Sequence, residues 1–153
     1  MRKTLNFIKD PFLASLKAKE HGLNSLDLMC GWGRSTQVLY QWYFESMGRR
    51  CNKRGNAYMI DFTNPMLTVA KLTKLKGNPN VTIHNMDATS IPWLNFFPIH
   101  FDIVTCWWNL CYIRAKGKMA LSMKKLNYLR GIRGVLRDEG YLILSEPISL
   151  KPE

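Results

Sequence analysis

The sequence predicts an α/β fold, a doubly wound and mainly parallel sheet of about five strands with helices on both faces. Along the 153 residues, short apolar runs alternate with longer segments of helical periodicity, a pattern typical of parallel sheets crossed by helices. The first apolar run, 25–29, breaks at Gly31 and Gly33 and continues into a helix-like segment over 34–47. A strand, a glycine turn and a helix start place free backbone N–H groups near one edge of such a sheet.

Four further apolar runs complete the predicted sheet. Besides 25–29, we expect strands over 57–60, 81–84, 101–106 and 141–145. Right-handed crossovers between these strands allow a ligand crevice at the C-terminal strand ends, where the winding direction switches.

Capping residues predict the helices between the strands. Asp10-Pro11 and Asn64-Pro65 each combine an N-cap residue with proline at the first helical position. We expect helices over 11–21, 34–47, 65–76 and 118–137, with a turn at 138–140 leading into the last strand. In the third helix the apolar positions predict a buried side made of Met66, Leu67, Val69, Ala70 and Leu72.

Composition indicates a single globular domain over 1–153. Hydrophobic residues make up 46% of the chain and charged residues 22%, which suits a folded protein. We expect an N-terminal helix within 1–22, a core over 23–147 and a tail over 148–153. No apolar run is long enough to span a bilayer, and the start of the chain lacks the apolar centre of a signal peptide. We therefore expect a cytoplasmic protein.

The cysteines favour reduced thiols over a metal site. The four cysteines form no CxxC pair and the three histidines are scattered, so the sequence predicts no metal ligands.

The net charge of +11 points to an anionic partner, which could be a nucleic acid, an acidic metabolite or a lipid surface. The alternative is a basic surface that only keeps the protein soluble. Basic residues are spread over several segments, so charge alone does not indicate a nucleic-acid module.

Polar, small and aromatic residues follow four of the predicted strands at the edge where their carboxyl ends meet. They are Gly31 and Gly33 after the first strand, Asp61 after the second, Asp87 after the third, and Cys106 with Trp107 at the end of the fourth. Each has a structural alternative: a tight turn for the glycines, a helix cap for Asp61, a turn for Asp87, and core packing for Trp107. Their convergence on one crevice favours a binding site.

The chemistry of these residues fits an adenosine-containing cofactor. An acid at the end of the second strand can accept hydrogen bonds from both ribose hydroxyls, and the glycines let a ligand approach the backbone closely. Asp87 can accept a bond from the adenine amino group, while the N–H of Ala88 can donate to a ring nitrogen. Met66 offers polarisable contact with the adenine face.

The sequence resembles the class I S-adenosylmethionine-dependent methyltransferases. The resemblance rests on the order and spacing of five segments, which are 26–36, 58–67, 86–88, 101–106 and 136–144. It covers roughly 23–147 and implies a Rossmann-like fold, the cofactor S-adenosyl-L-methionine, and methyl transfer.

The resemblance also implies roles for particular residues. Asp27 and the backbone from Cys30 to Gly33 would hold the methionine part, and Cys106 with Trp107 would line the floor beside it. Asp61 would bind the ribose. Around the adenine, the resemblance implies contacts from Phe62, Asp87 and Ala88.

Methyl transfer needs alignment and water exclusion, because the donor is already activated. A base is needed only if the acceptor loses a proton. His84, His100 and Tyr112 are candidates, but none has a supporting partner in the sequence, so the catalytic residues stay unassigned.

Two departures from the family bear on the substrate. The family's sheet has seven strands, whereas this sequence predicts five, so strands six and seven are lacking. We expect the fifth strand to pair with a second copy or another chain, unless the chain is a short or truncated member. The segment 107–112 lacks the Asn/Asp-Pro-Pro-aromatic signature of amino-methylating nucleic-acid enzymes, which argues against base N-methylation and leaves a planar or apolar acceptor.

Three functions remain open. A methyltransferase acting on a small molecule is favoured. An RNA methyltransferase is supported by the charge, and a catalytically silent binding protein by the missing strands. A nicotinamide-dependent dehydrogenase is weaker, because Thr36 stands where its fingerprint has a third small residue.

Overall fold

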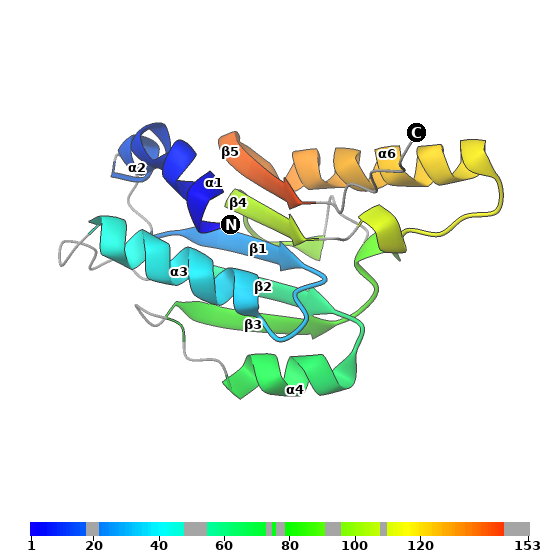
Figure 1. Cartoon of the computed structure of the whole chain (residues 1–153), viewed down its shortest axis with the longest axis horizontal. Helices are drawn as coiled ribbons and strands as arrows, with labels where there is room; N and C mark the ends of the chain where they lie inside the picture. The colour runs from blue at the N-terminus through cyan, green and yellow to red at the C-terminus, as the bar shows by residue number, and fades with distance from the viewer. Residues whose placement is uncertain are drawn as a thin grey trace, which may run out of the picture.

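A computed structural model describes residues 1–17, 22–47, 55–72, 75, 79–90, 96–107 and 110–145. Within these residues five parallel strands form one sheet in the order β3-β2-β1-β4-β5 (Figure 1). The strands are β1 (Asn24–Leu28), β2 (Asn56–Asp61), β3 (Asn80–Asn85), β4 (Phe101–Trp107) and β5 (Leu136–Ser145). The predicted α/β fold with a doubly wound parallel sheet is confirmed.

Helices flank this sheet and connect its strands. They are α1 (Arg2–Phe7), α2 (Lys9–Lys17), α3 (Arg34–Met47), α4 (Asn64–Leu72) and α6 (Lys118–Val135), with short 3-10 turns η2 (Ala88–Ser90) and η3 (Leu110–Tyr112). The chain winds outward from β1 to β3, then returns to β4 beside β1 and continues to β5. The winding direction therefore reverses between β1 and β4, where a crevice opens at the carboxyl ends of the strands.

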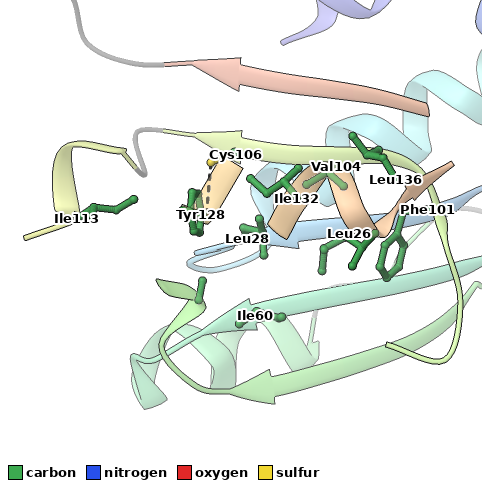
Figure 2. Close-up of a cluster of buried hydrophobic side chains, with 12 residues drawn as sticks. Leu26, Leu28, Ile60, Phe101, Val104, Cys106, Ile113, Tyr128, Ile132 and Leu136 are labelled. Carbon is green, nitrogen blue, oxygen red and sulfur yellow. Dashed lines mark hydrogen bonds between the residues drawn. The ribbon is translucent and has the colours of Figure 1, made fainter. Parts of the chain in front are cut away.

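One face of the sheet packs against α6. Alternation along β1 sends Leu26 and Leu28 to this face, where they join Tyr128 and Ile132 of α6 in a buried cluster (Figure 2). Cys106 of β4 lies in the same cluster, and its Sγ is 3.5 Å from the Tyr128 hydroxyl. The α6 helix is thus fixed to the sheet by one side only.

The opposite face packs against the N-terminal helices, α3 and α4. Phe12 of α2 stacks with Trp42 of α3 at a ring-centroid distance of 6.0 Å, and both belong to a second buried cluster that includes Ile103 of β4. Asp27 of β1 and Thr105 of β4 point to this same face, toward the start of α3. The alternation of β1 therefore places a carboxylate between the sheet and α3.

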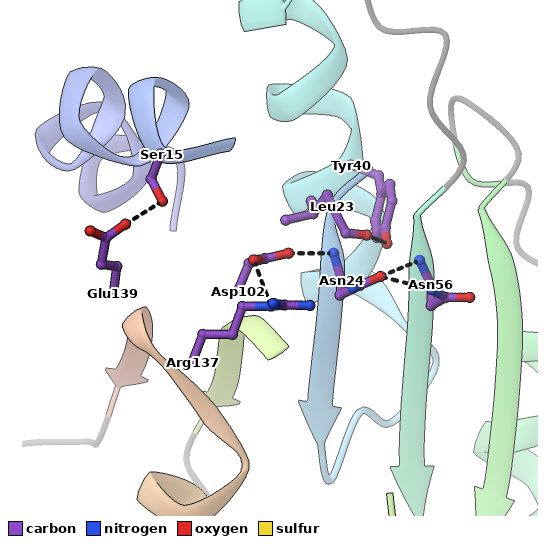
Figure 3. A network of polar contacts seen from close by, with 8 residues as sticks. All are labelled: Ser15, Leu23, Asn24, Tyr40, Asn56, Asp102, Arg137 and Glu139. Atoms are coloured by element: carbon purple, nitrogen blue, oxygen red, sulfur yellow. Dashed lines mark hydrogen bonds and ion pairs between the residues drawn. The ribbon is translucent and has the colours of Figure 1, made fainter. Parts of the chain in front are cut away.

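A polar network holds the amino ends of the strands together (Figure 3). Asp102 of β4 accepts a hydrogen bond from the backbone N–H of Asn24 at 2.9 Å, and Arg137 Nε lies 3.2 Å from its other carboxylate oxygen. The angle at Nε is not that of a hydrogen bond, so the second contact is ionic. Asn24 Oδ1 accepts from Asn56 Nδ2 at 2.8 Å, and Asn56 Oδ1 accepts from Asn80 Nδ2 at 3.2 Å. These side chains link all five strands of the sheet at their starts.

The N-terminal segment differs from the prediction of one helix over 11–21. It forms α1 and α2, and α2 already begins at Lys9. Pro11 occupies the first turn, where its missing N–H has no intrahelical acceptor in any case, so this proline does not mark the helix start. The last part of the predicted helix, 18–21, lies outside the described residues.

Two further predictions are wrong in detail, the buried face of α4 and the boundary between α6 and β5. In α4 only Leu67 and Ala70 are buried, while Met66, Val69 and Leu72 are exposed, because the helix meets the sheet along a narrow stripe. At the other end of the chain α6 stops at Val135 and β5 begins at once. The predicted turn over 138–140 is present as a bulge, since Phe101 pairs with Leu136 whereas Ile103 pairs with Tyr141.

The helices of the described ranges are all too short or too polar to cross a membrane. The predicted end of the third helix, 73–76, lies outside the described residues except for residue 75, and residues 48–54 between α3 and β2 lie outside them as well.

Candidate cofactor site

The loop between β1 and α3 has left-handed backbone conformations at three alternate residues. Met29, Gly31 and Gly33 have φ angles of +50°, +54° and +80°. At Gly31 the position of a Cβ would be open, with no atom within 4 Å, whereas at Gly33 a Cβ would lie 2.4 Å from Met59 Cε. Gly33 therefore serves the packing of the loop on β2, and Gly31 keeps its exposed side free of a side chain.

Asp27 anchors the start of α3 from below the loop. Its Oδ2 accepts hydrogen bonds from the Ser35 hydroxyl at 2.5 Å, the Thr36 hydroxyl at 2.6 Å and the Thr36 N–H at 3.2 Å. Its Oδ1 accepts from the Thr105 hydroxyl at 2.8 Å. Burial raises the pKa of the Asp27 carboxyl above its usual 3.8, although all of these bonds act in the opposite direction.

Asp61 ties the end of β2 to the glycine loop. Its Oδ2 accepts the backbone N–H of Gly31 at 2.8 Å, and its Oδ1 accepts the N–H of Thr63 at 2.8 Å. Each oxygen keeps capacity for a further donor, because a carboxylate offers about four lone-pair sites. Asp61 can thus close the turn before α4, its structural alternative, and still bind a ligand.

A cavity of about 770 Å³ opens at this edge of the sheet, in the range of ligand sites. It is bounded by the glycine loop, the start of α3, the ends of β2 and β4, the start of α4, η3 and the first residue of the chain. The lining residues are Met1, Met29, Cys30, Gly31, Trp32, Arg34, Ser35, Val38, Asp61, Phe62, Thr63, Met66, Trp107 and Tyr112.

Six of the eleven residues predicted for the site line this cavity. They are Cys30, Gly31, Asp61, Phe62, Met66 and Trp107. The other five lie around it: Asp27 and Gly33 beneath the loop, Asp87 and Ala88 at η2, and Cys106 in the core against α6. The structure thus brings the ends of β1, β2 and β4 together around one space.

The carboxylate of Asp87 closes a turn at the start of η2. It accepts from the Thr89 N–H at 2.8 Å and from the hydroxyls of Thr89 and Ser90 at 2.9 and 3.3 Å. Partial burial raises its pKa, but these bonds and the charge of Lys124 outweigh that effect, so the pKa lies below its usual value. Asp87 is therefore ionised and exposed beside the site.

The thiol of Cys30 is a poor nucleophile in this setting. Burial, followed by the negative charges of Asp27 and Asp61, raises its pKa far above the usual value. Across the ranges that the structure describes, no three metal-ligating side chains gather at one place.

Sequence reasoning assigned the backbone of Trp32 to the site but not its side chain, and it did not assign Arg34 or Val38. Trp32 stands between the two glycines and is 61% exposed, and Arg34 opens α3 beside it. A tryptophan within a glycine turn was the available signal, because a large apolar side chain on a surface turn is typical of binding sites. Val38, from the next turn of α3, carried no signal, since its helix position matched an ordinary core residue.

Of the three candidate bases, only Tyr112 lines the cavity. His84 of β3 stacks on Tyr58 and meets Phe96 edge to face, on the α6 face of the sheet. His100 lies near the amino edge, in a separate hollow with Arg133.

Comparison with known proteins identifies the family. A family model described as a methyltransferase domain matches residues 19–152. The match spans most of the chain, so the chain belongs to this family of methyltransferase domains, and the predicted class I S-adenosylmethionine-dependent methyltransferase family is confirmed. No curated protein sequence matches the chain.

Solved structures share the fold at low sequence identity. One is CalS10 with S-adenosylmethionine bound, an amino pentose methyltransferase from Micromonospora echinaspora, with 18% identity, a TM-score of 0.56 and coverage of 96% of this chain and 51% of that one. A second is an S-adenosylmethionine-dependent methyltransferase from Clostridium acetobutylicum, with 19% identity, a TM-score of 0.58 and coverage of 94% and 50%. A putative rRNA methylase from Clostridium thermocellum has 15% identity, a TM-score of 0.56 and coverage of 92% and 64%. The chain thus spans about half the length of the first two.

Proposed function

We propose that this chain binds S-adenosyl-L-methionine at the carboxyl edge of its sheet and transfers its methyl group to a small acceptor. The observation that carries the proposal is the 2.8 Å hydrogen bond from the Gly31 N–H to Asp61 Oδ2, made at the wall of the cavity. This bond joins the loop after β1 to the end of β2. The methyltransferase family of the chain supports the same cofactor.

The lining residues fit the parts of this cofactor. Asp61 offers its remaining lone pairs to the two ribose hydroxyls, and the open side of Gly31 leaves room for the ribose against the backbone. Phe62 and Met66 supply apolar surface for the adenine. Cys30 and Trp107 border the space left for the methionine part. Asp27 acts through the loop, since its carboxylate is already bound by Ser35, Thr36 and Thr105.

The bound cofactor supplies an activated methyl group on a sulfonium centre. The chain then has to align an acceptor with that methyl group and exclude water. Trp32, Trp107 and Tyr112 place aromatic side chains around the cavity, and their flat faces suit a planar or apolar acceptor. Tyr112 is the residue of this set that could hold or accept a proton, through its hydroxyl.

Calorimetry tests the cofactor assignment. We expect the folded chain to bind S-adenosylmethionine and S-adenosylhomocysteine and not NAD. Asp61→Ala should weaken binding by about 1–3 kcal/mol, because a buried hydrogen-bond acceptor is lost. Asp138→Ala, which removes an exposed carboxylate at the opposite end of the sheet, is the matched control and should bind like the parent chain. Absence of binding to both methyl-donor compounds in a folded sample would refute the proposal.

A transfer assay separates the acceptor classes. Radiolabelled S-adenosylmethionine is incubated with the chain and either a pool of small metabolites or RNA, and we expect label in the small-molecule pool. Trp32→Ala should reduce that transfer more than it reduces cofactor binding. RNA is the second candidate, supported by the net charge of +11. Label in RNA alone would replace the favoured acceptor class, and binding without transfer to either would indicate a catalytically silent protein.

A further inference from the structure

The outward side of α6 combines exposed apolar side chains with positive charge. Met119, Met123 and Leu126 are 83%, 49% and 41% exposed. Their spacing of four and three residues places them on one side of the helix, opposite Tyr128 and Ile132, which pack on the sheet (Figure 2). We call these three residues the α6 stripe.

The charge around the α6 stripe has a single sign. Residues 114–137 contain eight basic residues and no acidic one, which are Arg114, Lys116, Lys118, Lys124, Lys125, Arg130, Arg133 and Arg137. Two of them contact carboxylates: Arg137 pairs with Asp102, and Arg133 lies 3.6 Å from Asp138. Within the described part of the chain, Lys118, Lys125 and Arg130 have no ion pair. Most of this charge therefore faces solvent without compensation.

We propose that α6 docks this protein on the surface of an anionic lipid bilayer, with the α6 stripe in the headgroup region and the flanking lysines and arginines against lipid phosphates. Interfacial helices combine these two features, a narrow apolar side and basic flanks. At 18 residues α6 is about 27 Å long, and its first part reaches beyond the carboxyl ends of the strands (Figure 1). The side of α6 that carries the α6 stripe can thus meet a plane.

The apolar part of the surface favours lipid over RNA. Proteins that hold single-stranded nucleic acid without sequence preference stack its bases on aromatic side chains. The only aromatic residue in α6 is Tyr128, which is buried against the sheet. Exposed methionines gain nothing from phosphates, whereas they gain from the acyl boundary. Docking would also bring the cavity near the bilayer, because α6 begins beyond the carboxyl ends of the strands (Figure 1).

Vesicle co-sedimentation tests the proposal directly. The full chain is mixed with vesicles of phosphatidylcholine alone, or with about 30% phosphatidylglycerol, at low and high salt. We expect binding to the anionic vesicles only, weakened by salt. No binding to them at low salt would overturn the proposal.

A matched pair of variants tests the apolar contribution. Met119→Gln with Met123→Gln should weaken vesicle binding at least about tenfold. Leu72→Gln with Val69→Gln changes two apolar residues of α4 with nearly the same exposure, 79% and 48%, and should bind like the parent chain. Circular dichroism establishes that each variant is folded. Unchanged binding of the methionine variant would overturn the proposal.

A second pair tests the charge. Lys118→Gln with Arg130→Gln should weaken binding roughly twenty-five-fold, at about fivefold per charge. Lys3→Gln with Lys9→Gln removes two exposed lysines from α1 and α2 and should have little effect. Equal losses in both variants would mean that net charge rather than α6 is responsible, which overturns the assignment of the surface.

Two further probes distinguish other occupants. Tighter binding of polyuridylic acid than of vesicles, unaffected by the methionine substitutions, would replace the lipid with a nucleic acid. A second outcome is that the chain does not bind vesicles, its mass rises with concentration, and the methionine variant loses this association. That result would make a second copy of the chain, rather than the bilayer, the partner of α6. Both results are independent of cofactor binding, which calorimetry measures on the same samples.

Discussion

Asp61 at the carboxyl end of β2 and Asp102 at the amino end of β4 occupy comparable positions at opposite ends of the sheet. Each accepts a backbone N–H from β1 or the loop that follows it, Gly31 at 2.8 Å and Asn24 at 2.9 Å. Asp102 also has Arg137 at 3.2 Å, whereas no basic side chain in the described ranges pairs with Asp61. Asp102 is fully buried, and Asp61 borders the cavity.

The difference separates a structural carboxylate from one available to a ligand. At the amino ends, charge and hydrogen-bond capacity are used within the protein, as Asn24 and Asn56 also show (Figure 3), together with Asn80 of β3. At the carboxyl ends, Asp61 keeps lone pairs beside exposed aromatic side chains. Substitutions at the amino ends should therefore change stability, and substitutions at the carboxyl ends should change binding.

The largest effect on stability is expected from Arg137→Leu. It leaves the Asp102 carboxylate buried without its cation, which should lower the free energy of unfolding by about 3 kcal/mol, measured by urea denaturation. Cofactor affinity should stay the same.

Arg133→Leu is the matched control for that variant, because Arg133 and Asp138 are both solvent-exposed and such pairs contribute little. A loss of less than about 1 kcal/mol in Arg137→Leu would mean that Asp102 tolerates burial through its hydrogen bonds alone.

The sequence was sufficient for the parts of the fold that depend on local pattern. The bounds of α3 agree with the prediction, because a glycine loop precedes Arg34 and a glycine follows Met47. Asp61 and Gly31 could be assigned to one site because parallel strands bring their carboxyl ends to one edge.

Tertiary contacts decided what the sequence could not. The exposure of Val69 and Leu72 follows from how closely α4 approaches β3, which their spacing does not encode. Tyr112 lines the cavity because of the position that η3 takes after β4. The side chain of Trp32 was not assigned, because the glycines on either side explained that turn through its backbone alone.

Asp27 provides a third carboxylate, one that is buried like Asp102 but has hydrogen bonds in place of a cation. Because burial raises its pKa above 3.8, the folded state binds a proton more readily than the unfolded state. Its contribution to stability should therefore fall as the pH rises from about 3.8 through the folded pKa, at no more than about 1.4 kcal/mol per pH unit.

Asp27→Asn removes this titration. Unfolding free energies of the two proteins, measured over the same pH series, should diverge in favour of the variant as the pH rises. Parallel curves would show that the hydrogen bonds from Ser35, Thr36 and Thr105 fully offset the burial of the charge.

Phe62→Ala tests the binding end of the comparison without touching the core. The ring is 65% exposed at the cavity, so its loss should leave stability within about 0.5 kcal/mol. Under the proposed function, affinity for S-adenosylhomocysteine should fall by about 1 kcal/mol, since aromatic contact with the adenine is lost. Phe7→Ala, at an exposed ring of α1, is the control. A drop in stability with unchanged affinity would show that Phe62 has a structural role and no role in binding.

Substitutions at the side edge formed by β5 should have the smallest effect on the free energy of unfolding and the largest effect on self-association. Its outer backbone groups have no strand partner within the described residues, and Leu142 and Leu144 are exposed on it. Such an edge favours pairing with a second copy, so light scattering should show a mass that rises with concentration. Leu142→Lys with Leu144→Lys should reduce that association while changing the free energy of unfolding by less than about 0.5 kcal/mol. A monomer at every concentration would show that the bulge over 138–140 and the strand's own twist already protect this edge.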